Sequence, residues 1–345
     1  MTVDNNQSVS EFELIKRYFL NIGKASSLSS AIDVDIGDDC AVLSVAEGKR
    51  LAFSIDTLVA GKHFPEQADA VDIAQRALAV SISDLAAMGA TPLAFTLALT
   101  LPAADVEWLQ KFSDGLAKAA DHYAIALIGG DTTQGPLSIT IQVHGELPAH
   151  SAIQRKNAQP GDVVFVSGSL GDAAAALMVI DSTLSLEQVE HDYLLQRYYQ
   201  PEVRIKLGES LLTVATAAID ISDGLLADVM HIAQASNVII QIDAEKLPLS
   251  SAIKKIFLKE EREKLALTGG DDYELCFTAP PSAKAQINNV AKSLGVAITE
   301  IGRVVDRNNS AGGEEISGDL QNPMVRCVDA DGNLMKYDRN GYQHF

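Results

Sequence analysis

The sequence has few cysteines and few aromatic residues, and its charge is strongly one-sided. Cys40, Cys276 and Cys327 are the only cysteines, and they form no Cys-x-x-Cys pair. A disulfide framework is therefore not expected, and the pattern is typical of a reducing compartment. Lys and Arg number 27 against 46 Asp and Glu, which gives a formal net charge of −19. Because nucleic acids and anionic membranes bind basic faces, we expect neither as a partner.

Targeting and membrane-spanning segments are also missing. Residues 1–13 lack the basic-then-apolar pattern of a signal peptide. The uncharged stretch Leu85–Ala104 is interrupted by Gly89 and Pro92 and contains Pro102 near its end, so it predicts a helix end, a turn and a buried strand. We expect a cytoplasmic protein with no membrane contact.

Several motifs of nucleotide and metal enzymes are absent. The chain has no Gly-x-x-x-x-Gly-Lys-Ser/Thr loop and no protein-kinase signature, which argues against a Walker-type site and a protein-kinase site. Its histidines show no His-Glu-x-x-His spacing and no Cys/His pattern. A zinc site is therefore not expected.

The chain has enough length and apolar content for two domains. It has 345 residues, of which 47% are hydrophobic. A chain of this length is too long for a single hydrophobic core of average size, which favours two domains. A new unit is expected to begin near Leu147-Pro148, which predicts an N-terminal domain 1–148 and a C-terminal domain 149–345. Helices and strands alternate in the first half, which favours an α/β or α+β fold. Predicted helices are 71–88, 105–123, 172–180 and 225–235, and predicted strands include 51–55, 93–101, 125–128, 163–166 and 217–221.

Acidic side chains recur where predicted elements meet. Taken singly, each has a structural explanation, because Asp before a helix caps it and Asp after Gly forms turns. Asp223 would cap a helix that begins near Leu225. Asp84 is different, because it lies inside an apolar helix, where an unpaired carboxylate is costly to bury. The recurring residues are Asp39, Asp56, Asp84, Asp131, Asp220, Asp223 and Asp271.

Together these carboxylates predict a shared, cation-dependent site. Several carboxylates can gather only if cations neutralise them, and hard oxygen ligands favour magnesium over zinc. The backbone N–H groups of Gly129-Gly130, next to Asp131, can approach phosphate oxygens closely. Composition and spacing thus predict an enzyme that handles phosphate with several magnesium ions.

Six internal segments and the C-terminus resemble the thiamine-monophosphate kinase family. The likeness runs in order from about residue 10 to the last residue. The segments are Ile36-Gly37-Asp38-Asp39-Cys40-Ala41, Asp56-Thr57-Leu58-Val59-Ala60-Gly61-Lys62-His63-Phe64, Ser83-Asp84-Leu85-Ala86-Ala87-Met88-Gly89-Ala90, Ile128-Gly129-Gly130-Asp131-Thr132-Thr133, Ile219-Asp220-Ile221-Ser222-Asp223-Gly224, Gly269-Gly270-Asp271-Asp272-Tyr273-Glu274-Leu275 and Gly341-Tyr342-Gln343-His344-Phe345.

The resemblance implies the fold shared with aminoimidazole-ribotide synthetase. In that fold an α/β N-terminal domain is followed by an α+β C-terminal domain, and two chains form a homodimer through their N-terminal sheets. The implied reaction converts ATP and thiamine phosphate into ADP and thiamine diphosphate by direct in-line transfer. No general base is assigned, because the acceptor is a phosphate oxygen that is already anionic at neutral pH.

The resemblance also implies roles for individual residues. The implied magnesium ligands are Asp39, Ser54, Asp56, Asp84, Asp131, Asp220 and Asp223. The implied ATP contacts are Gly130, Asp131, Arg155 and Ser222, with Arg155 meeting phosphate as a charged fork. The implied thiamine-phosphate contacts are His63, Asp271 and Tyr342.

Two positions depart from the family pattern, and two implied roles have plain alternatives. Asp271 stands where the family usually has Glu, so its substrate contact would be longer or bridged by water. Ile55 stands where threonine is common, which removes one side-chain metal contact. For His63 the alternative is a surface histidine, and for Tyr342 it is packing of the tail.

Three rival functions stay open at this point. The first is another ATP enzyme of the same superfamily. A selenophosphate synthetase would need a reactive Cys near the N-terminus, and a hydrogenase-maturation protein would need a C-terminal Cys, where this chain has Phe345. The second is a non-catalytic nucleotide- or metal-binding relative, and the third is a metal-dependent phosphatase.

Overall fold

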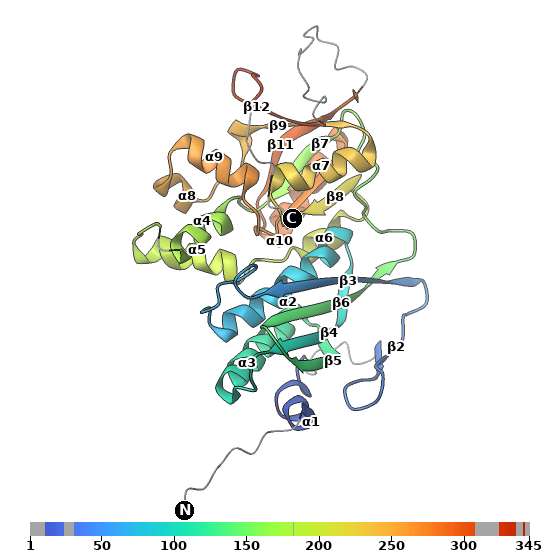
Figure 1. Ribbon diagram of the computed structural model, residues 1–345. Coiled ribbons are helices and arrows are strands. Elements are labelled where there is room, and N and C mark those ends of the chain that lie inside the picture. The colour runs from blue at the N-terminus through green and yellow to red at the C-terminus, as the bar shows by residue number, and fades with distance from the viewer. Residues whose placement is uncertain (1–10, 24–30, 182, 308–323, 336–340, 342–345) are drawn as a thin grey trace, which may run out of the picture. The chain divides into compact units, whose positions relative to one another are not determined.

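The computed structural model describes residues 11–23, 31–181, 183–307, 324–335 and 341 (Figure 1). The chain forms two compact units. Unit 1 contains residues 1–82 and 92–146, and unit 2 contains residues 83–91 and 147–345. Residues 83–91 group with unit 2, and the domain boundary after residue 148 stays a prediction. Tyr342, a predicted substrate contact, lies outside the described residues.

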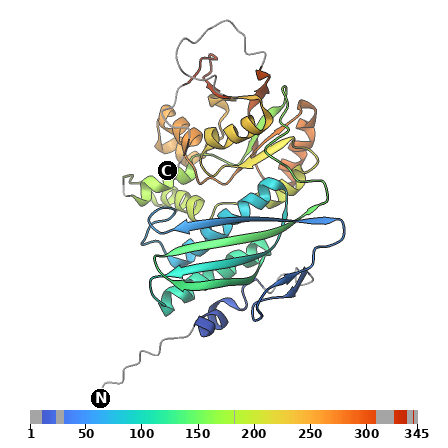
Figure 2. The same cartoon turned by 45° about the vertical axis from the view of Figure 1, so that its right-hand side comes forward.

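Unit 1 is built on a four-stranded sheet with the order β3-β6-β4-β5. β4 and β5 run parallel, while β3 and β5 are the two edge strands. Figure 2 shows this sheet with helices α2 (Ala70–Met88) and α3 (Val106–Tyr123) covering one of its faces. The strands are β3 (Lys49–Val59), β4 (Thr91–Leu101), β5 (Ala126–Gln134) and β6 (Ser138–Pro148).

Alternating side chains explain how this sheet buries one face. In β6 the residues Ile139, Ile141 and Val143 are fully buried, and the residues between them are only partly covered. α3 starts at the N-cap Asp105, whose carboxylate accepts hydrogen bonds from the N–H groups of Glu107 and Trp108.

Smaller elements of unit 1 lie beside β4 and β5. α1 (Glu11–Leu14) continues directly into a π-helical turn, Ile15–Phe19. β1 (Ile32–Val34) pairs antiparallel with β2 (Val42–Leu43). Ala31, Ile32, Ala41 and Leu43 pack against the buried residues Leu93, Ala94, Ala126 and Ile128.

Unit 2 is built on a six-stranded sheet with the order β12-β9-β11-β7-β10-β8. β12 runs parallel to β9, and the pairs β9–β11, β11–β7, β7–β10 and β10–β8 are antiparallel. The strands are β7 (Val163–Ser167), β8 (Ala217–Asp220), β9 (Ile239–Asp243), β10 (Leu275–Ala279), β11 (Ile298–Val305) and β12 (Val325–Val328).

Both faces of this sheet are covered, so β7 is buried throughout. Val164 and Val166 belong to a core with α7, while Val163 and Phe165 belong to a second core with α6. Ala86 and Ala87, from the end of α2, join the second core. The helices are α4 (Asp172–Ile180), α5 (Gln188–Tyr199), α6 (Ile205–Leu211), α7 (Leu225–Ser236), α8 (Ser251–Ile256), α9 (Lys259–Thr268) and α10 (Lys284–Leu294), with 3-10 turns at Ala244–Lys246 and Pro281–Ala283.

Two sequence predictions about strand ends are wrong. Asp56 was expected to end a strand 51–55, but β3 continues to Val59. Asp131 was expected to follow a strand 125–128, but it lies inside β5. Phe95 pairs with Leu127 and Thr96 with Gly129, so Ile128 is an extra residue that shifts the register and lets the strand continue. Within the described part of the chain, no helix combines the length and the hydropathy needed to cross a bilayer.

Candidate active site

Three predicted site residues line one pocket in unit 1. The pocket has a volume of about 470 Å³. Its floor is the edge strand β5, and its other walls come from the Ile36–Ala41 loop and from the first helical turns. Ile15, Phe19 and Leu127 give it an apolar part, and Asp39, Gly130 and Asp131 give it a polar part.

Gly130 is required by the way β5 packs on β4. Its φ is +157°, and a Cβ at this position would lie 1.9 Å from the carbonyl oxygen of Leu97. A side chain there would push β5 away from β4 and displace Asp131, the next residue. Asp131 and Asp39 are both exposed, so their carboxylate oxygens are accessible from the pocket. Such a pocket can hold a ligand with a flat apolar part and an anionic part that carries metal.

The residues expected on β3 lie at the other edge of the same sheet. Ser54 and Asp56 alternate along β3 with Phe53 and Ile55, so the two pairs face opposite sides of the sheet. Because β6 and β4 stand between β3 and β5, Ser54 and Asp56 lie on the edge strand opposite to that of Asp131.

His63 lies in the turn that follows β3. The ring Nδ1 of His63 accepts a hydrogen bond from the backbone N–H of Val59 at 3.0 Å. The backbone N–H of His63 donates to the Val59 carbonyl, also at 3.0 Å. In the neutral ring the proton is therefore on Nε2, which makes Nε2 a hydrogen-bond donor. This arrangement suits a contact to an anionic oxygen.

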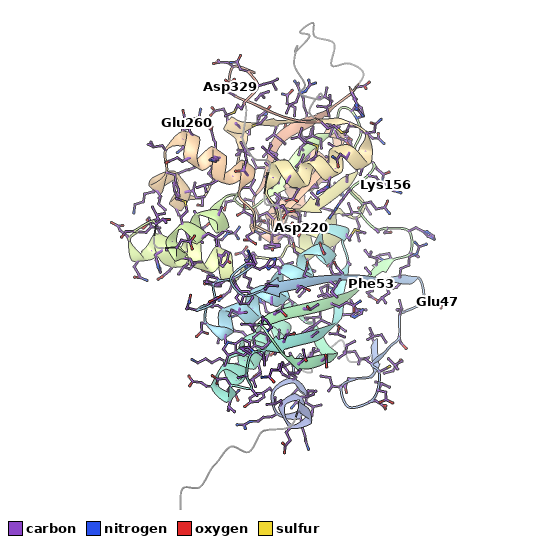
Figure 3. All side chains as sticks on the ribbon, viewed as in Figure 1. Glu47, Phe53, Lys156, Asp220, Glu260 and Asp329 are labelled. Atoms are coloured by element: carbon purple, nitrogen blue, oxygen red, sulfur yellow. The ribbon has the colours of Figure 1, made fainter. Side chains whose placement is uncertain are left out.

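A second group of acidic residues lies in unit 2, where β8 meets α7. Asp220 is the last residue of β8 and is only 5% exposed (Figure 3). The Ser83 hydroxyl donates a hydrogen bond of 2.6 Å to Oδ2 of Asp220. Asp84, the neighbour of Ser83 in α2, is half-buried.

Asp228, which sequence reasoning missed, shapes the loop that carries Ser222 and Asp223. Its Oδ2 accepts hydrogen bonds from the N–H groups of Ser222, Asp223 and Gly224 at 3.0, 3.0 and 3.1 Å. Burial, together with the charges of Asp220 and Asp223, raises the pKa of Asp228 to about 7, although the backbone hydrogen bonds oppose the rise. One signal could have revealed Asp228, because it is the only acidic residue of α7.

The loop Gly269–Glu274 runs beside Ser222. The Asp271 N–H donates to the Ser222 carbonyl and the Tyr273 N–H donates to the Ile221 carbonyl, both at 2.8 Å. The structure therefore brings Asp271, a predicted substrate contact, next to Ser222, a predicted ATP contact. Arg155, the other predicted ATP contact of unit 2, is exposed.

The predicted metal ligands are chemically suited to magnesium. Asp39 and Asp131 in unit 1, and Asp223 in unit 2, offer the carboxylate oxygens that this ion prefers. Among the residues that the structure describes, no three His, Cys, Asp or Glu side chains lie close enough together to hold an ion. Magnesium in enzymes of phosphate transfer is commonly held by one or two carboxylates together with substrate phosphates, so a complete protein cage is not needed.

Family models match both halves of the chain. The model described as "AIR synthase related protein, N-terminal domain" covers residues 37–147, and the model of the C-terminal domain covers residues 159–313. A thiamine-monophosphate kinase from Salmonella typhimurium is 44% identical over 339 residues, which is 97% of this chain and 98% of that protein.

Solved structures show the same likeness. A crystal structure of a thiamine-monophosphate kinase from Stenotrophomonas maltophilia K279a has a TM-score of 0.79 and 43% identity, and the match covers 86% of this chain and 95% of that one. AaThiL complexed with AMPPCP and TMP has a TM-score of 0.72 and 31% identity, with 98% and 97% covered. The hydrogenase maturation protein HypE in complex with ATP has a TM-score of 0.70 at 18% identity, which is a likeness of fold alone.

Proposed function

This chain belongs to the thiamine-monophosphate kinase family, and we propose that it transfers the terminal phosphoryl group of ATP to thiamine phosphate, releasing ADP and thiamine diphosphate. The supporting observation is the pocket of unit 1, which brings Asp39, Gly130 and Asp131 together. These residues carry two of the family motifs and come from separate parts of the chain. Identity of 44% over nearly the whole length supports the same activity.

We assign ATP to this pocket. The apolar side chains Ile15, Phe19 and Leu127 can pack against a flat base, and we place the phosphates beside Asp39 and Asp131, which line the polar part of the pocket. Magnesium bound by Asp39 and Asp131 would neutralise the charge of the transferring phosphoryl group. Ser54, Asp56, Asp84, Asp220 and Asp223 stay predicted magnesium ligands. Ser222 and Arg155 in unit 2 stay predicted ATP contacts, and Asp228 holds the backbone at Ser222 in place.

His63 and Asp271, each taken within its own unit, stay the predicted contacts of the acceptor, thiamine phosphate. With its proton on Nε2, His63 can donate a hydrogen bond to the phosphate of thiamine phosphate. Asp271 offers a carboxylate to the cationic part of that molecule. Because the attacking oxygen already belongs to a phosphate, no general base is required, and catalysis rests on position and charge. Tyr342 stays a prediction.

We propose that the protein acts as a homodimer that pairs through unit 1. The edge strand β3 carries a row of exposed apolar side chains, Leu51, Phe53 (66% exposed, Figure 3) and Ile55 (60%). An edge strand with an exposed apolar row is unfavourable in a monomer, because it invites pairing with another chain. We also propose a cytoplasmic location, supported by the three cysteines, which are all free.

The decisive experiment is a product assay. Purified protein is incubated with ATP, magnesium and thiamine phosphate, and ADP and thiamine diphosphate are separated by chromatography. We expect equal amounts of both products, no thiamine diphosphate when free thiamine replaces thiamine phosphate, and loss of activity without magnesium or in Asp84→Asn. ADP with free phosphate but no thiamine diphosphate would favour a phosphatase or another ATP enzyme of the superfamily. ATP binding without turnover would favour a non-catalytic relative.

A further inference from the structure

Two residues of the loop Gly269–Glu274 have an unusual backbone conformation. Asp271 has a φ of +70° and Tyr273 has a φ of +51°. The left-handed region is uncommon for residues other than glycine, and a bulky residue such as Tyr occupies it rarely. Conformations of this kind persist only where the surrounding structure enforces them, and they are concentrated at functional sites.

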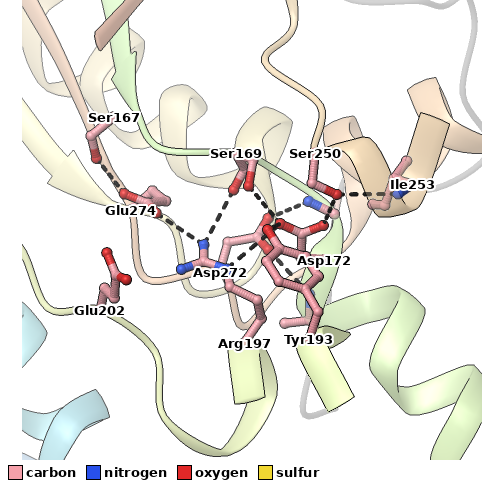
Figure 4. Close-up of polar contacts among 12 residues, drawn as sticks. Ser167, Ser169, Asp172, Tyr193, Arg197, Glu202, Ser250, Ile253, Asp272 and Glu274 are labelled. Carbon is pink, nitrogen blue, oxygen red and sulfur yellow. Dashed lines mark hydrogen bonds and ion pairs between the residues drawn. The ribbon is translucent and has the colours of Figure 1, made fainter. Parts of the chain in front are cut away.

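The residues that alternate with them, Asp272 and Glu274, are buried anchors. Asp272 is 1% exposed and Glu274 is 0% exposed. The Glu274 carboxylate accepts hydrogen bonds from Arg204 Nε (2.6 Å) and Nη2 (2.7 Å) and from Arg197 Nη2 (2.9 Å). The Ser167 hydroxyl donates a further bond of 2.6 Å (Figure 4). A carboxylate fixed by four donors leaves the backbone at residue 274 little freedom.

Asp272 is anchored at the start of α4. Its Oδ2 accepts from the Gly171 N–H at 2.7 Å, and its Oδ1 accepts from the Ala173 N–H at 3.4 Å. The neighbouring Asp172 accepts from the hydroxyls of Ser169, Tyr193 and Ser250 (Figure 4). Arg197 connects the regions around the two anchors, because it pairs with Asp172 (Nε to Oδ2, 3.6 Å) and also with Glu274.

Local shape and charge support these contacts. Gly168 has a φ of +60°, and a Cβ there would lie 1.9 Å from Oε1 of Glu274, so only glycine leaves room for the carboxylate. Burial disfavours a charged Arg197, but the charges of Glu274, Asp272 and Asp172 outweigh burial and hold its pKa above the ordinary value. Burial likewise disfavours a charged Arg204, but its hydrogen bonds to Glu274 and the charge of that carboxylate raise its pKa. Both guanidinium groups that fix Glu274 therefore stay charged.

We propose that Glu274 and Asp272 are positioning residues, and that Arg204 and Arg197 act through Glu274. Anchoring residues 272 and 274 forces residues 271 and 273 into the left-handed backbone, which fixes Asp271 next to Ser222 and presents its carboxylate to the acceptor. The hydroxyl of Tyr273 donates to Oδ1 of Asp271 at 3.3 Å, a long contact that orients this carboxylate. The inference rests on the proposed function, because it assumes that Asp271 contacts thiamine phosphate.

The test variant is Arg204→Lys, which keeps the charge but loses the planar fork that binds Glu274. We expect the KM for thiamine phosphate to rise about tenfold, the usual scale for losing a group that orients a ligand-binding residue. The KM for ATP and kcat should change by less than about twofold, and the KM increase should have a parallel in weaker thiamine-phosphate binding by calorimetry. Glu202→Gln is the matched control, because Glu202 pairs with Nη1 of the same arginine from an exposed position and does not touch Glu274.

A double-mutant cycle separates positioning from a general structural effect. Asn accepts the left-handed conformation more readily than Tyr, so the loop of Tyr273→Asn depends less on its buried anchors. Because this variant also loses the hydroxyl contact to Asp271, the effect of Arg204→Lys is measured relative to Tyr273→Asn itself. We expect Arg204→Lys to raise the KM for thiamine phosphate clearly less in the Tyr273→Asn background than in the wild type. If Arg204→Lys does not fold, as judged by thermal unfolding, Ser167→Ala replaces it, since it removes only one of the four donors to Glu274.

The possible outcomes are distinct. A selective rise in the KM for thiamine phosphate that shrinks in the Tyr273→Asn background supports the proposal. An equal effect on both substrates, the same effect from Glu202→Gln, or full additivity in the cycle overturns it while leaving the proposed function intact. A wild-type protein that neither phosphorylates nor binds thiamine phosphate overturns the proposed function, and the inference with it.

Discussion

The hydroxyl of Ser83 and the carboxylate of Asp220 are 2.6 Å apart, although 137 residues separate them in the chain. Ser83 precedes Asp84 in α2, and Asp220 ends β8. Both side chains are buried, so the hydrogen bond helps to satisfy a carboxylate that would otherwise be costly to keep away from water. It joins two of the family motifs within unit 2.

Ser83→Ala should therefore lower the free energy of unfolding. A buried hydrogen bond to a charged group contributes about 1.5–3 kcal/mol, and urea unfolding followed by circular dichroism measures the loss. Ser81→Ala is the matched control in the same helix, because the Ser81 hydroxyl donates only to the Ala77 carbonyl one turn earlier. It should cost about 1 kcal/mol or less. Equal losses in the two variants would contradict the special importance of the Ser83–Asp220 bond.

Asp131→Asn should impair use of magnesium-bound ATP. The substitution keeps the shape of the side chain but removes the charge that faces the pocket beside Gly130. We expect kcat/KM for ATP to fall on the order of 100-fold and the magnesium concentration for half-maximal rate to increase. Asp114→Asn, an exposed residue of α3 that accepts a hydrogen bond from Gln110, is the control. An Asp131→Asn enzyme with normal magnesium dependence would remove Asp131 from the metal site.

Phe53→Glu should convert the proposed dimer into a monomer. The change places a charge in the middle of the exposed apolar row on β3, where pairing of two chains would bury it. Light scattering coupled to gel filtration gives the mass in solution. Val189→Glu is the control, since Val189 is an exposed apolar residue of α5, far from β3 in the sequence. A wild-type protein that is already monomeric, or a dimeric Phe53→Glu variant, would rule out pairing through this row.

His144 should make stability depend on pH. It lies in β6, its Nδ1 is buried without a hydrogen-bond partner among the described residues, and burial lowers its pKa below the ordinary value of 6.5. Just below pH 6.5 the unfolded chain therefore binds a proton that the folded chain does not, so the free energy of unfolding falls as the pH decreases from 6.5 toward the folded-state pKa. Urea unfolding between about pH 5 and pH 8 tests this. The fall attributable to His144 should disappear in His144→Gln, and an unchanged pH profile in that variant would contradict the prediction.

The sequence predicted the regular elements well where one pattern dominated. The alanine-rich helix 172–180 and the helix 71–88 occupy nearly the predicted residues, because helical spacing of apolar residues and clear end signals agreed there. At Gly129-Gly130 the same local rules predicted that the strand had ended at residue 128 and were wrong. Pairing with β4, with Ile128 as the extra residue, keeps these glycines in a strand. That pairing is a contact with a distant segment, which no local rule contains.

In the candidate site too, some features follow from local sequence and others only from contacts between distant segments. The types and order of the motif residues follow from the sequence, and so does membership of the thiamine-monophosphate kinase family, because side-chain chemistry and spacing are properties of the chain itself. None of the sequence motifs includes Asp228, Arg197 or Arg204. The importance of these residues comes from their burial and from the hydrogen-bond partners that folding brings to them.

The sequence alone therefore determined which groups are available: carboxylates, a pair of adjacent glycines, and one histidine within a family motif. Only the tertiary structure decided that Asp39 and Asp131 share a pocket, that Ser54 and Asp56 lie on the other edge strand, and that buried arginines hold the backbone around Asp271. The physical reason is that hydrogen bonding, burial and electrostatic interaction depend on distances in space, and these join residues that lie more than a hundred positions apart in the chain.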